Sequence, residues 1–419
     1  MNIDELRRTF SSNKTSYSIP SLMPAMVAKK GMVGNLQLHQ ESVQTPHIGS
    51  DEALVAIMAA GLNFNTIWTA LGEPVSTFDF LKRHRLVDNT PQDHNLDYHI
   101  PGSDASGFIV KLGTANTKWK IGDEVVINCN WHRSDDPIVY DDALLSEEQK
   151  IWGYETNFGS FAAFSVVKIH QLMKKPKHLN WFEAASYSLV LSTAYRMLIS
   201  KNGASIKPGD NVLIWGGAGG LGLSAIQLCK LAGAEPIPVV SSQKKGELLI
   251  QLGVKDYIDR KSDNLNFWKN GEHNILAWRK LRSIINKKFN TIPNVVFEHP
   301  GKETMAASIY NLTKGGKVVT CAATTGYDIQ YDNRYLWMNS KSIIGCHFAN
   351  SNESNIVNGL INDDKIKTFV SCTYDFNDIN EALKKFVENS GYGKIVIGVL
   401  ADNKTKTNYN SNIIKVMNA

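Results

Sequence analysis

The sequence predicts a doubly wound parallel α/β sheet inserted into a mainly β domain. A buried strand runs into a glycine-rich turn and a helix over residues 211–232, and strands alternate with helices from about residue 180 to 345. Shorter strands, punctuated by turns, precede this region. Alternation of this kind is typical of a parallel sheet with helices on both faces. We therefore expect residues 1–190 and 347–419 to form one domain and residues 191–346 the other.

Length and composition limit the class of protein. The chain has 419 residues, which is long for one hydrophobic core and favours two domains. Its net charge of +5 is not carried by a long basic run and does not indicate a nucleic-acid partner. No run of about 18 apolar residues predicts a membrane span, and residues 1–8 lack the apolar core of a secretory signal.

The five cysteines are scattered, and none forms a CxxC pair. This distribution predicts neither a structural zinc site nor a disulfide framework, and no metal is expected. A reducing, cytoplasmic location is expected for such a chain.

The N-terminal part predicts a rolled or barrel-like sheet. Residues 1 to about 30 include a polar run at 11–16 and are expected to form a peripheral arm. The acidic, irregular segment 134–150 is expected to be a surface loop. Short strands bounded by glycine-containing turns are typical of a closed or rolled sheet. They are predicted at residues 52–58, 108–112 and 124–128.

From residue 180 the hydrophobic period changes to that of helices and buried strands. One helix is predicted over 181–196, and the segment 261–290 is too long for a simple connection, so we expect an insertion with a helix near 275–285. Further strands are predicted at 212–215, 236–240, 256–258, 294–297, 317–321, 342–345 and 394–400. Further helices are predicted at 221–232, 244–252 and 379–388.

The glycine-rich turn fits the fingerprint of a dinucleotide site, because it follows a strand and opens a helix. Glycines permit the tight turn, the approach of backbone N–H groups to a pyrophosphate, and close packing of helix on strand. The anion then lies at the positive end of the helix dipole. The predicted cofactor-binding residues of this turn are Gly217, Ala218, Gly219, Gly220, Leu221 and Gly222.

The end of the following strand indicates which nucleotide binds. A carboxylate there would accept a hydrogen bond from the ribose 2′-hydroxyl of NADH, but the sequence reads Val-Val-Ser-Ser-Gln-Lys-Lys over 239–245. Hydroxyl and ammonium groups suit a 2′-phosphate, so Ser241, Ser242 and Lys245 predict NADPH. A simpler interpretation, which can hold together with this one, is that Ser241 is the N-cap of the next helix and that Lys244 and Lys245 are solvated.

Short motifs spread over residues 43–400 carry a resemblance to a known family. They are residues 61–68, 73–78, 102–107, 152–159, 192–196, 216–222, 297–301, 334–338 and 345–350. In these motifs the chain resembles the crotonyl-CoA carboxylase/reductases (enoyl-CoA carboxylase/reductases) of the medium-chain dehydrogenase/reductase superfamily. The resemblance implies a Rossmann domain inserted in a GroES-like substrate domain, and a homo-oligomer, usually a homotetramer.

The resemblance also implies a reaction. NADPH gives hydride to the β-carbon of an enoyl-CoA such as crotonyl-CoA, and the α-carbon then attacks CO2 to give an alkylmalonyl-CoA. Because CO2 is small and weakly bound, the site should donate hydrogen bonds to its oxygens and exclude protons and loose water.

In the family an Asn amide contacts CO2, a Phe shields the pocket, and a Glu and a His hold a positioned water. The Glu corresponds to Glu155 and the His to His347, while Tyr154 stands where Phe is common. The Asn is Asn63 or Asn65; we favour Asn65, although alternation along a strand would place both side chains on one face.

Simpler structural roles exist for the same side chains. Glu155 could be a surface carboxylate or a helix-dipole partner, His347 a core histidine, and Asn65 a turn residue. In the superfamily the position of Thr193 approaches the nicotinamide, but a threonine inside a helix can also bond back to a carbonyl. His299 could orient the cofactor or only shape a turn.

Three other functions compete with reductive carboxylation. The first is an enoyl-CoA reductase, of the acrylyl-CoA type, that does not carboxylate. The second is a quinone reductase, for which the 152–159 and 345–350 motifs are unexpected. The third is a non-catalytic NADP-binding scaffold, which NADPH oxidation with crotonyl-CoA would exclude.

Overall fold

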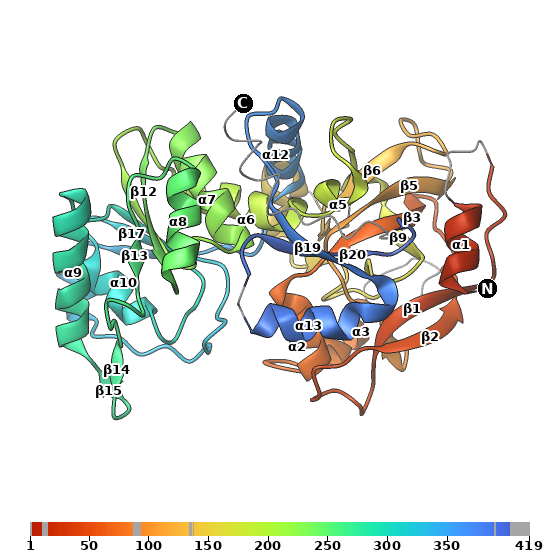
Figure 1. Cartoon of the computed structure of the whole chain (residues 1–419). Helices are drawn as coiled ribbons and strands as arrows, with labels where there is room; N and C mark the ends of the chain where they lie inside the picture. The colour runs from red at the N-terminus through yellow and green to blue at the C-terminus, as the bar shows by residue number, and fades with distance from the viewer. Residues whose placement is uncertain are drawn as a thin grey trace. The chain divides into compact units, whose positions relative to one another are not determined.

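The computed structural model describes residues 2–10, 16–86, 94–133, 136, 138–388 and 391–402. The chain divides into two compact units. The second unit is Val190–Ala349, and the first is built from residues on both sides of it (Figure 1).

The second unit contains a six-stranded sheet in which every pair of neighbouring strands is parallel. The strands lie in the order β13-β12-β11-β16-β17-β18, which is that of a doubly wound dinucleotide-binding fold. The fold class predicted for this region is therefore confirmed. The strands are β11 (Asn211–Ile214), β12 (Glu235–Val240), β13 (Ile258–Asp259), β16 (Val295–Glu298), β17 (Lys317–Thr320) and β18 (Ser342–Gly345).

Helices cover both faces of this sheet (Figure 1). On one face, Trp278 and Leu281 of α9 and Ile309 of α10 pack on Leu213 and Val296 of the sheet. On the other, α7 and α8 pack against β11, β12 and β13. The helices are α6 (Ser188–Leu198), α7 (Gly220–Leu231), α8 (Gln243–Gln251), α9 (Ile275–Phe289), α10 (Met305–Asn311) and α11 (Arg334–Trp337). A small hairpin, β14 (Trp268–Lys269) and β15 (Glu272–His273), precedes α9 in the predicted insertion.

The first unit is mainly β. Its central strand, β3 (Glu52–Gly61), is buried along its whole length and pairs with β5, β9 and β20. The other strands of this sheet are β5 (Ala105–Leu112), β6 (Glu124–Ile127), β9 (Phe164–Lys168), β10 (Leu172–Lys174), β19 (Val370–Asp375) and β20 (Lys394–Gly398). A three-stranded sheet contains β1 (Leu22–Lys29), β2 (His39–Gln44) and β4 (Tyr98–His99). A two-stranded sheet contains β7 (Asn130–Trp131) and β8 (Lys150–Ile151).

Seven α-helices among the described residues complete the first unit. The two that matter for the site are α2 (Phe64–Leu71), which follows β3, and α3 (Thr77–His84). The others are α1 (Ile3–Thr9), α4 (Val139–Asp142), α5 (Trp181–Ala184), α12 (Ser351–Asn362) and α13 (Ile379–Val387).

Some local predictions for the first unit are wrong. The N-terminal segment is not a peripheral arm, because Ile3 and Leu6 of α1 are buried and β1 is buried along most of its length. Part of the polar run, residues 11–15, lies outside the described residues. The predicted loop at 134–150 contains α4 and the buried carboxylate of Asp142, while residues 134, 135 and 137 lie outside the description. The helix predicted at 181–196 is split into α5 and α6.

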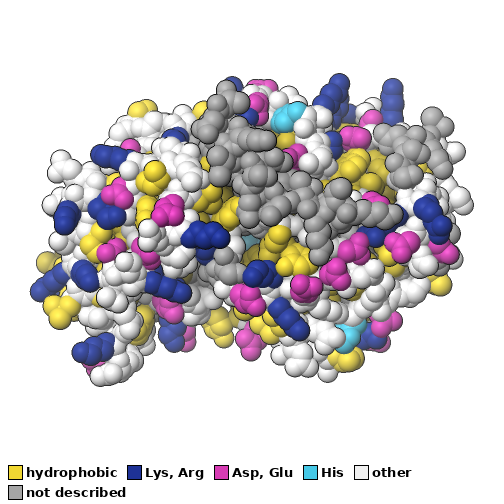
Figure 2. Space-filling model, viewed as in Figure 1, with side chains coloured by type: hydrophobic (Ala, Val, Ile, Leu, Met, Phe, Trp, Pro, Cys, Tyr) yellow, Lys and Arg dark blue, Asp and Glu magenta, His cyan; other side chains and the backbone are white. Residues whose placement is uncertain are grey.

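No helix in the described part of the chain is long and apolar enough to cross a bilayer. Basic and acidic side chains are interspersed over the face shown in Figure 2. All five cysteines are free thiols.

Candidate active site

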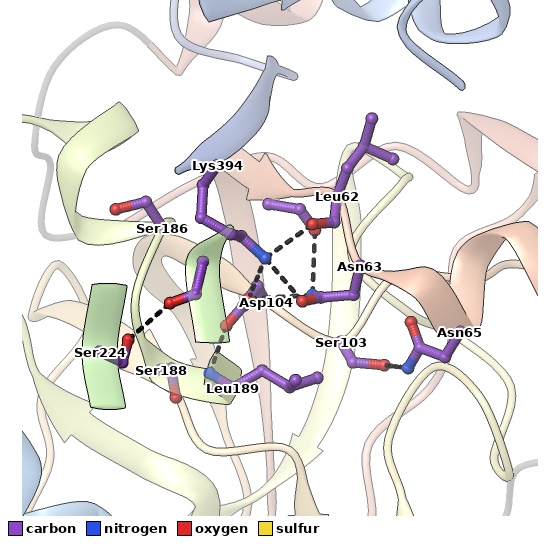
Figure 3. Close-up of polar contacts among 12 residues, drawn as sticks. Leu62, Asn63, Asn65, Ser103, Asp104, Ser186, Ser188, Leu189, Ser224 and Lys394 are labelled. Carbon is purple, nitrogen blue, oxygen red and sulfur yellow. Dashed lines mark hydrogen bonds and ion pairs between the residues drawn. The ribbon is translucent and has the colours of Figure 1, made fainter. Parts of the chain in front are cut away.

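The two candidate asparagines lie where β3 gives way to α2. Asn63 is the N-cap of α2, and Asn65 lies in its first turn. The expectation that strand alternation places both side chains on one face is therefore wrong, because the helix begins at Phe64. Asn63 points to Asp104 and Lys394, whereas Asn65 points to Ser103 (Figure 3).

The Asn65 carboxamide makes one hydrogen bond within the protein and keeps other hydrogen-bonding groups for a ligand. Its Nδ2 donates to Ser103 Oγ at 2.8 Å. Its Oδ1 is buried and has no hydrogen-bond partner among the described residues. An amide has two N–H donors and a carbonyl acceptor, so Asn65 retains a donor and an acceptor for a ligand. An unpartnered buried polar atom of this kind is costly unless a ligand or water satisfies it.

The loop that carries Tyr154 and Glu155 packs tightly on the turn that carries Ser103. Gly102 N donates to Gly153 O at 3.1 Å. Gly153 has a φ of +70°, and a Cβ added there would lie 2.0 Å from Gly102 O, so only glycine fits. Glu155 Oε2 accepts from Ile151 N at 2.8 Å, which fixes its half-buried carboxylate within the loop.

Tyr154 lies in an aromatic group that joins the loop to α2 and α3. Its ring centroid is 6.2 Å from that of Trp68 and 5.8 Å from that of Phe80. Burial, and then the charge of Glu155, raise the pKa of the Tyr154 phenol well above its usual value. None of the described residues hydrogen-bonds its hydroxyl. Tyr154 therefore presents a neutral hydroxyl that is available to a ligand or a water.

His347 and Thr193 belong to the second unit. His347 follows β18 and is exposed, so the alternative that it is a core histidine is wrong. Thr193 lies on α6 and is 5% exposed. The structure thus gathers Asn65, Tyr154 and Glu155 within the first unit. The grouping of His347 with them remains a prediction.

The glycine-rich turn has the geometry of an anion cradle. Gly219 is the N-cap of α7, and the first amides of this helix, those of Gly220, Leu221 and Gly222, have no acceptor within the helix. The turn is also tightly packed, because a Cβ added to Gly222 would lie 2.3 Å from Gly216 O.

The end of β12 carries a basic cluster that the sequence predicted only in part. Lys245 Nζ lies 3.4 Å from Ser241 Oγ. Burial lowers the pKa of the Lys245 ammonium, and the charges of Lys261 and Arg260 lower it further. The prediction that Ser241 caps the next helix is wrong, because the N-cap of α8 is Ser242.

Arg260 and Lys261 were missed because they follow a different strand. β12 and β13 are parallel neighbours with Val240 opposite Asp259 in register. The residues that follow each strand therefore emerge side by side. The sequence shows a basic pair, Arg260 and Lys261, shortly after the predicted strand 256–258. It does not show that this strand pairs with β12.

A buried glutamate at the end of β16 was also missed. Glu298 is fully buried and accepts from Gly301 N, Thr304 Oγ1 and Ser308 Oγ at 3.0, 2.7 and 2.6 Å. Burial raises its pKa to about 7, against the lowering effect of these hydrogen bonds. The next residue, His299, bonds Trp215 O through Nε2 at 3.0 Å. Both side chains shape the turn beside the glycine-rich loop.

Glu298→Gln is expected to weaken the pH dependence of stability. Because the folded-state pKa lies above the ordinary value of 4.5, the contribution of Glu298 is fully present below about pH 4.5 and is lost as the pH rises through about 7. The Tm of the native protein should therefore fall, relative to that of Glu298→Gln, by about 4 °C over this range. Thermal unfolding followed at several pH values measures this difference. The exposed neighbour Glu303, replaced by Gln, is the control; equal behaviour of the two variants would contradict the assignment.

Two family models match the chain. The alcohol dehydrogenase GroES-like domain matches residues 49–177, and the zinc-binding dehydrogenase model matches residues 220–363. Within the described ranges, no group of three or more His, Cys, Asp or Glu side chains is arranged to hold a metal ion.

Individual proteins match over most of their length. The chain is 46% identical over 367 residues to a crotonyl-CoA reductase of Streptomyces collinus, covering 87% of this chain and 82% of that protein. It is 43% identical over 364 residues to a crotonyl-CoA carboxylase/reductase of Cereibacter sphaeroides, covering 83% and 80%.

Solved structures agree with these matches. A 2-octenoyl-CoA carboxylase reductase in complex with NADP and 2-octenoyl-CoA is 34% identical, with a TM-score of 0.89 over 99% of this chain and 94% of that one. An NAD-dependent alcohol dehydrogenase, 24% identical with a TM-score of 0.76, shares the fold. Given these identities over most of both chains, the protein belongs to the crotonyl-CoA carboxylase/reductase family of the medium-chain dehydrogenase/reductases.

Proposed function

We propose that this protein catalyses the NADPH-dependent reductive carboxylation of an α,β-unsaturated acyl-CoA, such as crotonyl-CoA, to an alkylmalonyl-CoA. The observation that carries the proposal is the Asn65 carboxamide: one N–H of its Nδ2 is anchored on Ser103 Oγ, which leaves the second N–H to donate to a ligand. We assign the first unit to the substrate and the second unit, Val190–Ala349, to NADP; His347, which the sequence placed in the substrate domain, thus belongs to the NADP-binding unit.

The residues of the second unit fit NADPH. The amides of Gly220, Leu221 and Gly222 and the positive end of α7 suit a pyrophosphate, whereas those of Gly217 and Gly219 already donate to Val239 O and Gly216 O and shape the turn. Ser241, Ser242 and Lys245, together with Arg260, suit a 2′-phosphate, which needs donors and positive charge. Thr193 would lie near the nicotinamide. When bound, NADPH supplies the hydride that reduces the β-carbon of the substrate.

Asn65, Tyr154 and Glu155 of the first unit would control the fate of the carbanion at the α-carbon. Asn65 donates a hydrogen bond from its Nδ2 to an oxygen of CO2 and so stabilises the carboxylate as it forms. Tyr154 covers the pocket with its ring. Glu155 has the role of the family Glu, and His347, in the second unit, that of the family His; in the family these two residues hold a positioned water and keep it from protonating the α-carbon.

Assays of NADPH oxidation with crotonyl-CoA, with and without bicarbonate, test the proposal when the product mass is measured. We expect an alkylmalonyl-CoA that is one CO2 heavier than the reduced acyl-CoA. A reduced acyl-CoA at saturating bicarbonate would instead assign the protein to the enoyl-CoA reductases that do not carboxylate. Absence of NADPH oxidation would favour a non-catalytic scaffold.

Tyr154→Phe is expected to raise the ratio of carboxylated to reduced product, by about two- to tenfold at limiting bicarbonate. The phenol hydroxyl has no partner among the described residues, so it can hold a water close to the carbanion, and phenylalanine keeps the ring without this donor. Product masses at several bicarbonate concentrations measure the ratio. Trp68 and Phe80 still pack on the ring in this variant, and an unchanged ratio would contradict the role given to the hydroxyl.

We further propose a homo-oligomer, a homotetramer, formed in the cytoplasm. The support is the edge strand β18, which pairs with β17 on one side and, within the described residues, has no strand on the other. Ile343 on this strand is 37% exposed, and the nearby Trp337 is 63% exposed. Such an apolar edge is typical of a covered surface. Light scattering should give a multiple of the chain mass, and Ile343→Lys should lower it. A monomeric native protein would contradict the proposal.

A further inference from the structure

A buried lysine lies at the centre of a hydrogen-bond network at the end of β3. Lys394, the first residue of β20, is 4% exposed. Its Nζ donates to Leu62 O and Asn63 Oδ1, both at 2.6 Å, and to Asp104 Oδ2 at 3.0 Å (Figure 3). All three N–H groups of the ammonium are therefore used within the protein.

Asp104 completes the network. It is fully buried, and its Oδ2 also accepts from Asn63 Nδ2 at 2.9 Å. Its Oδ1 accepts from Leu189 N, in the first turn of α6, at 2.8 Å. Its backbone carbonyl accepts from Gly61 N at 3.1 Å. One carboxylate and one ammonium thus join the end of β3, the turn before β5, and the starts of β20 and α6.

This network is directly attached to the candidate amide for CO2. Ser103, which accepts from Asn65, immediately precedes Asp104, which accepts from Asn63. Asn63 is the N-cap of the helix that carries Asn65, although its side chain makes no capping hydrogen bond because it is turned toward Lys394. Two consecutive residues of one turn therefore fix both asparagines, and Lys394 fixes the first of them.

Stability alone does not account for such a pair. Burying a carboxylate and an ammonium costs several kcal/mol for each ion, and apolar side chains of similar volume often replace buried ion pairs without loss of stability. Burial accordingly lowers the pKa of Lys394, while Asp104 opposes this change. A buried pair with every hydrogen bond satisfied does, however, define one geometry for the segments that it joins.

We propose that Lys394 and Asp104 are positioning residues: they fix the start of α2 and the 103–104 turn, and so hold the Asn65 amide where CO2 must bind. This inference rests on the proposed function, because it deepens the role assigned there to Asn65. It predicts that loss of the pair changes the fate of the carbanion more than it changes the binding of NADPH.

The test compares variants at the two ends of β3. Lys394→Met removes the ammonium, and Lys394→Met with Asp104→Asn removes both charges. Lys168→Met is the matched control: Lys168 is also buried, and its Nζ lies 3.4 Å from Glu52 Oε1 at the start of the same strand. Product masses, the KM for CO2 and the KM for NADPH are measured for the three variants and the native enzyme.

We expect both Lys394 variants to raise the KM for CO2 and the share of reduced product by about tenfold, with the KM for NADPH little changed. The double variant should regain thermal stability over Lys394→Met without regaining the product ratio, because no charge is left unpaired. Lys168→Met should lower the Tm and keep the ratio. The inference would be overturned if the ratio of carboxylated to reduced product fell in proportion to the Tm in all variants. It would also be overturned if the double variant recovered the product ratio of the native enzyme.

Hydrogen exchange separates this inference from the proposed function. Backbone amides of residues 62–66 and 103–106 should exchange faster in Lys394→Met than in Lys168→Met, whatever reaction the enzyme catalyses. If the native enzyme only reduces its substrate but exchange changes as expected, the proposed function fails and the positioning role stands. If the native enzyme carboxylates and neither exchange nor the product ratio responds to Lys394→Met, the positioning role fails alone.

Discussion

Asn65→Leu is expected to convert the enzyme from a carboxylase into a reductase, with a loss of about 100-fold in kcat/KM for CO2. Leucine has a size similar to that of asparagine but cannot donate to an oxygen of CO2 or bond Ser103. The hydride step needs neither contact, so NADPH oxidation should fall far less. The measurement is the mass of the products, together with NADPH oxidation over a range of bicarbonate concentrations.

The matched control for Asn65→Leu is Thr69→Val. Thr69 lies one turn further along α2, is buried, and donates to Asn65 O at 3.0 Å. Its replacement perturbs the same helix but leaves the Asn65 amide in place. If Thr69→Val shifted the products as far as Asn65→Leu, the effect would come from the helix and not from the amide. An unchanged product ratio in Asn65→Leu would remove Asn65 from the proposed mechanism.

The strand and helix pattern of the second unit could be predicted from the sequence because it depends on local signals. The glycine-rich turn needs a short stretch of chain, and a buried parallel strand appears as a continuous apolar run. The predicted strand at 342–345 coincides with β18, and the predicted helix near 275–285 lies inside α9. Where elements begin depends on packing, so the split of 181–196 into α5 and α6 was not predictable in this way.

The site depends on contacts between distant parts of the chain. The different directions of Asn63 and Asn65 follow from a helix that begins between them and from Lys394, which is 331 positions away from Asn63. No periodicity in the sequence links these residues. The same reason hid Arg260, whose place beside Lys245 follows from the pairing of β12 with β13. The resemblance in short motifs indicated Glu155 and His347, but it could not predict the hydrogen bond of Glu155 or the exposure of His347.

Lys245→Ala is expected to raise the KM for NADPH by about 10- to 100-fold and to leave the KM for NADH nearly unchanged. The 2′-phosphate is the group that distinguishes the two cofactors, and a hydrogen bond between charged groups contributes more than a neutral one. Lys245 is half-buried at the end of β12 beside Ser241, and burial and neighbouring cations already lower the pKa of its ammonium. An arriving phosphate would relieve this repulsion, which strengthens the contact.

Lys244→Ala provides the control for Lys245→Ala, because Lys244 is the adjacent residue on α8 and is exposed. Both variants lose one positive charge, so any effect of net charge on the approach of an anionic cofactor is common to them. Only Lys245→Ala removes the ammonium beside Ser241. Steady-state kinetics with each cofactor, at low and high salt, separate a contact from general attraction, since screening weakens the latter. Equal changes in both variants, or equal changes for NADPH and NADH, would show that Lys245 does not bind the 2′-phosphate.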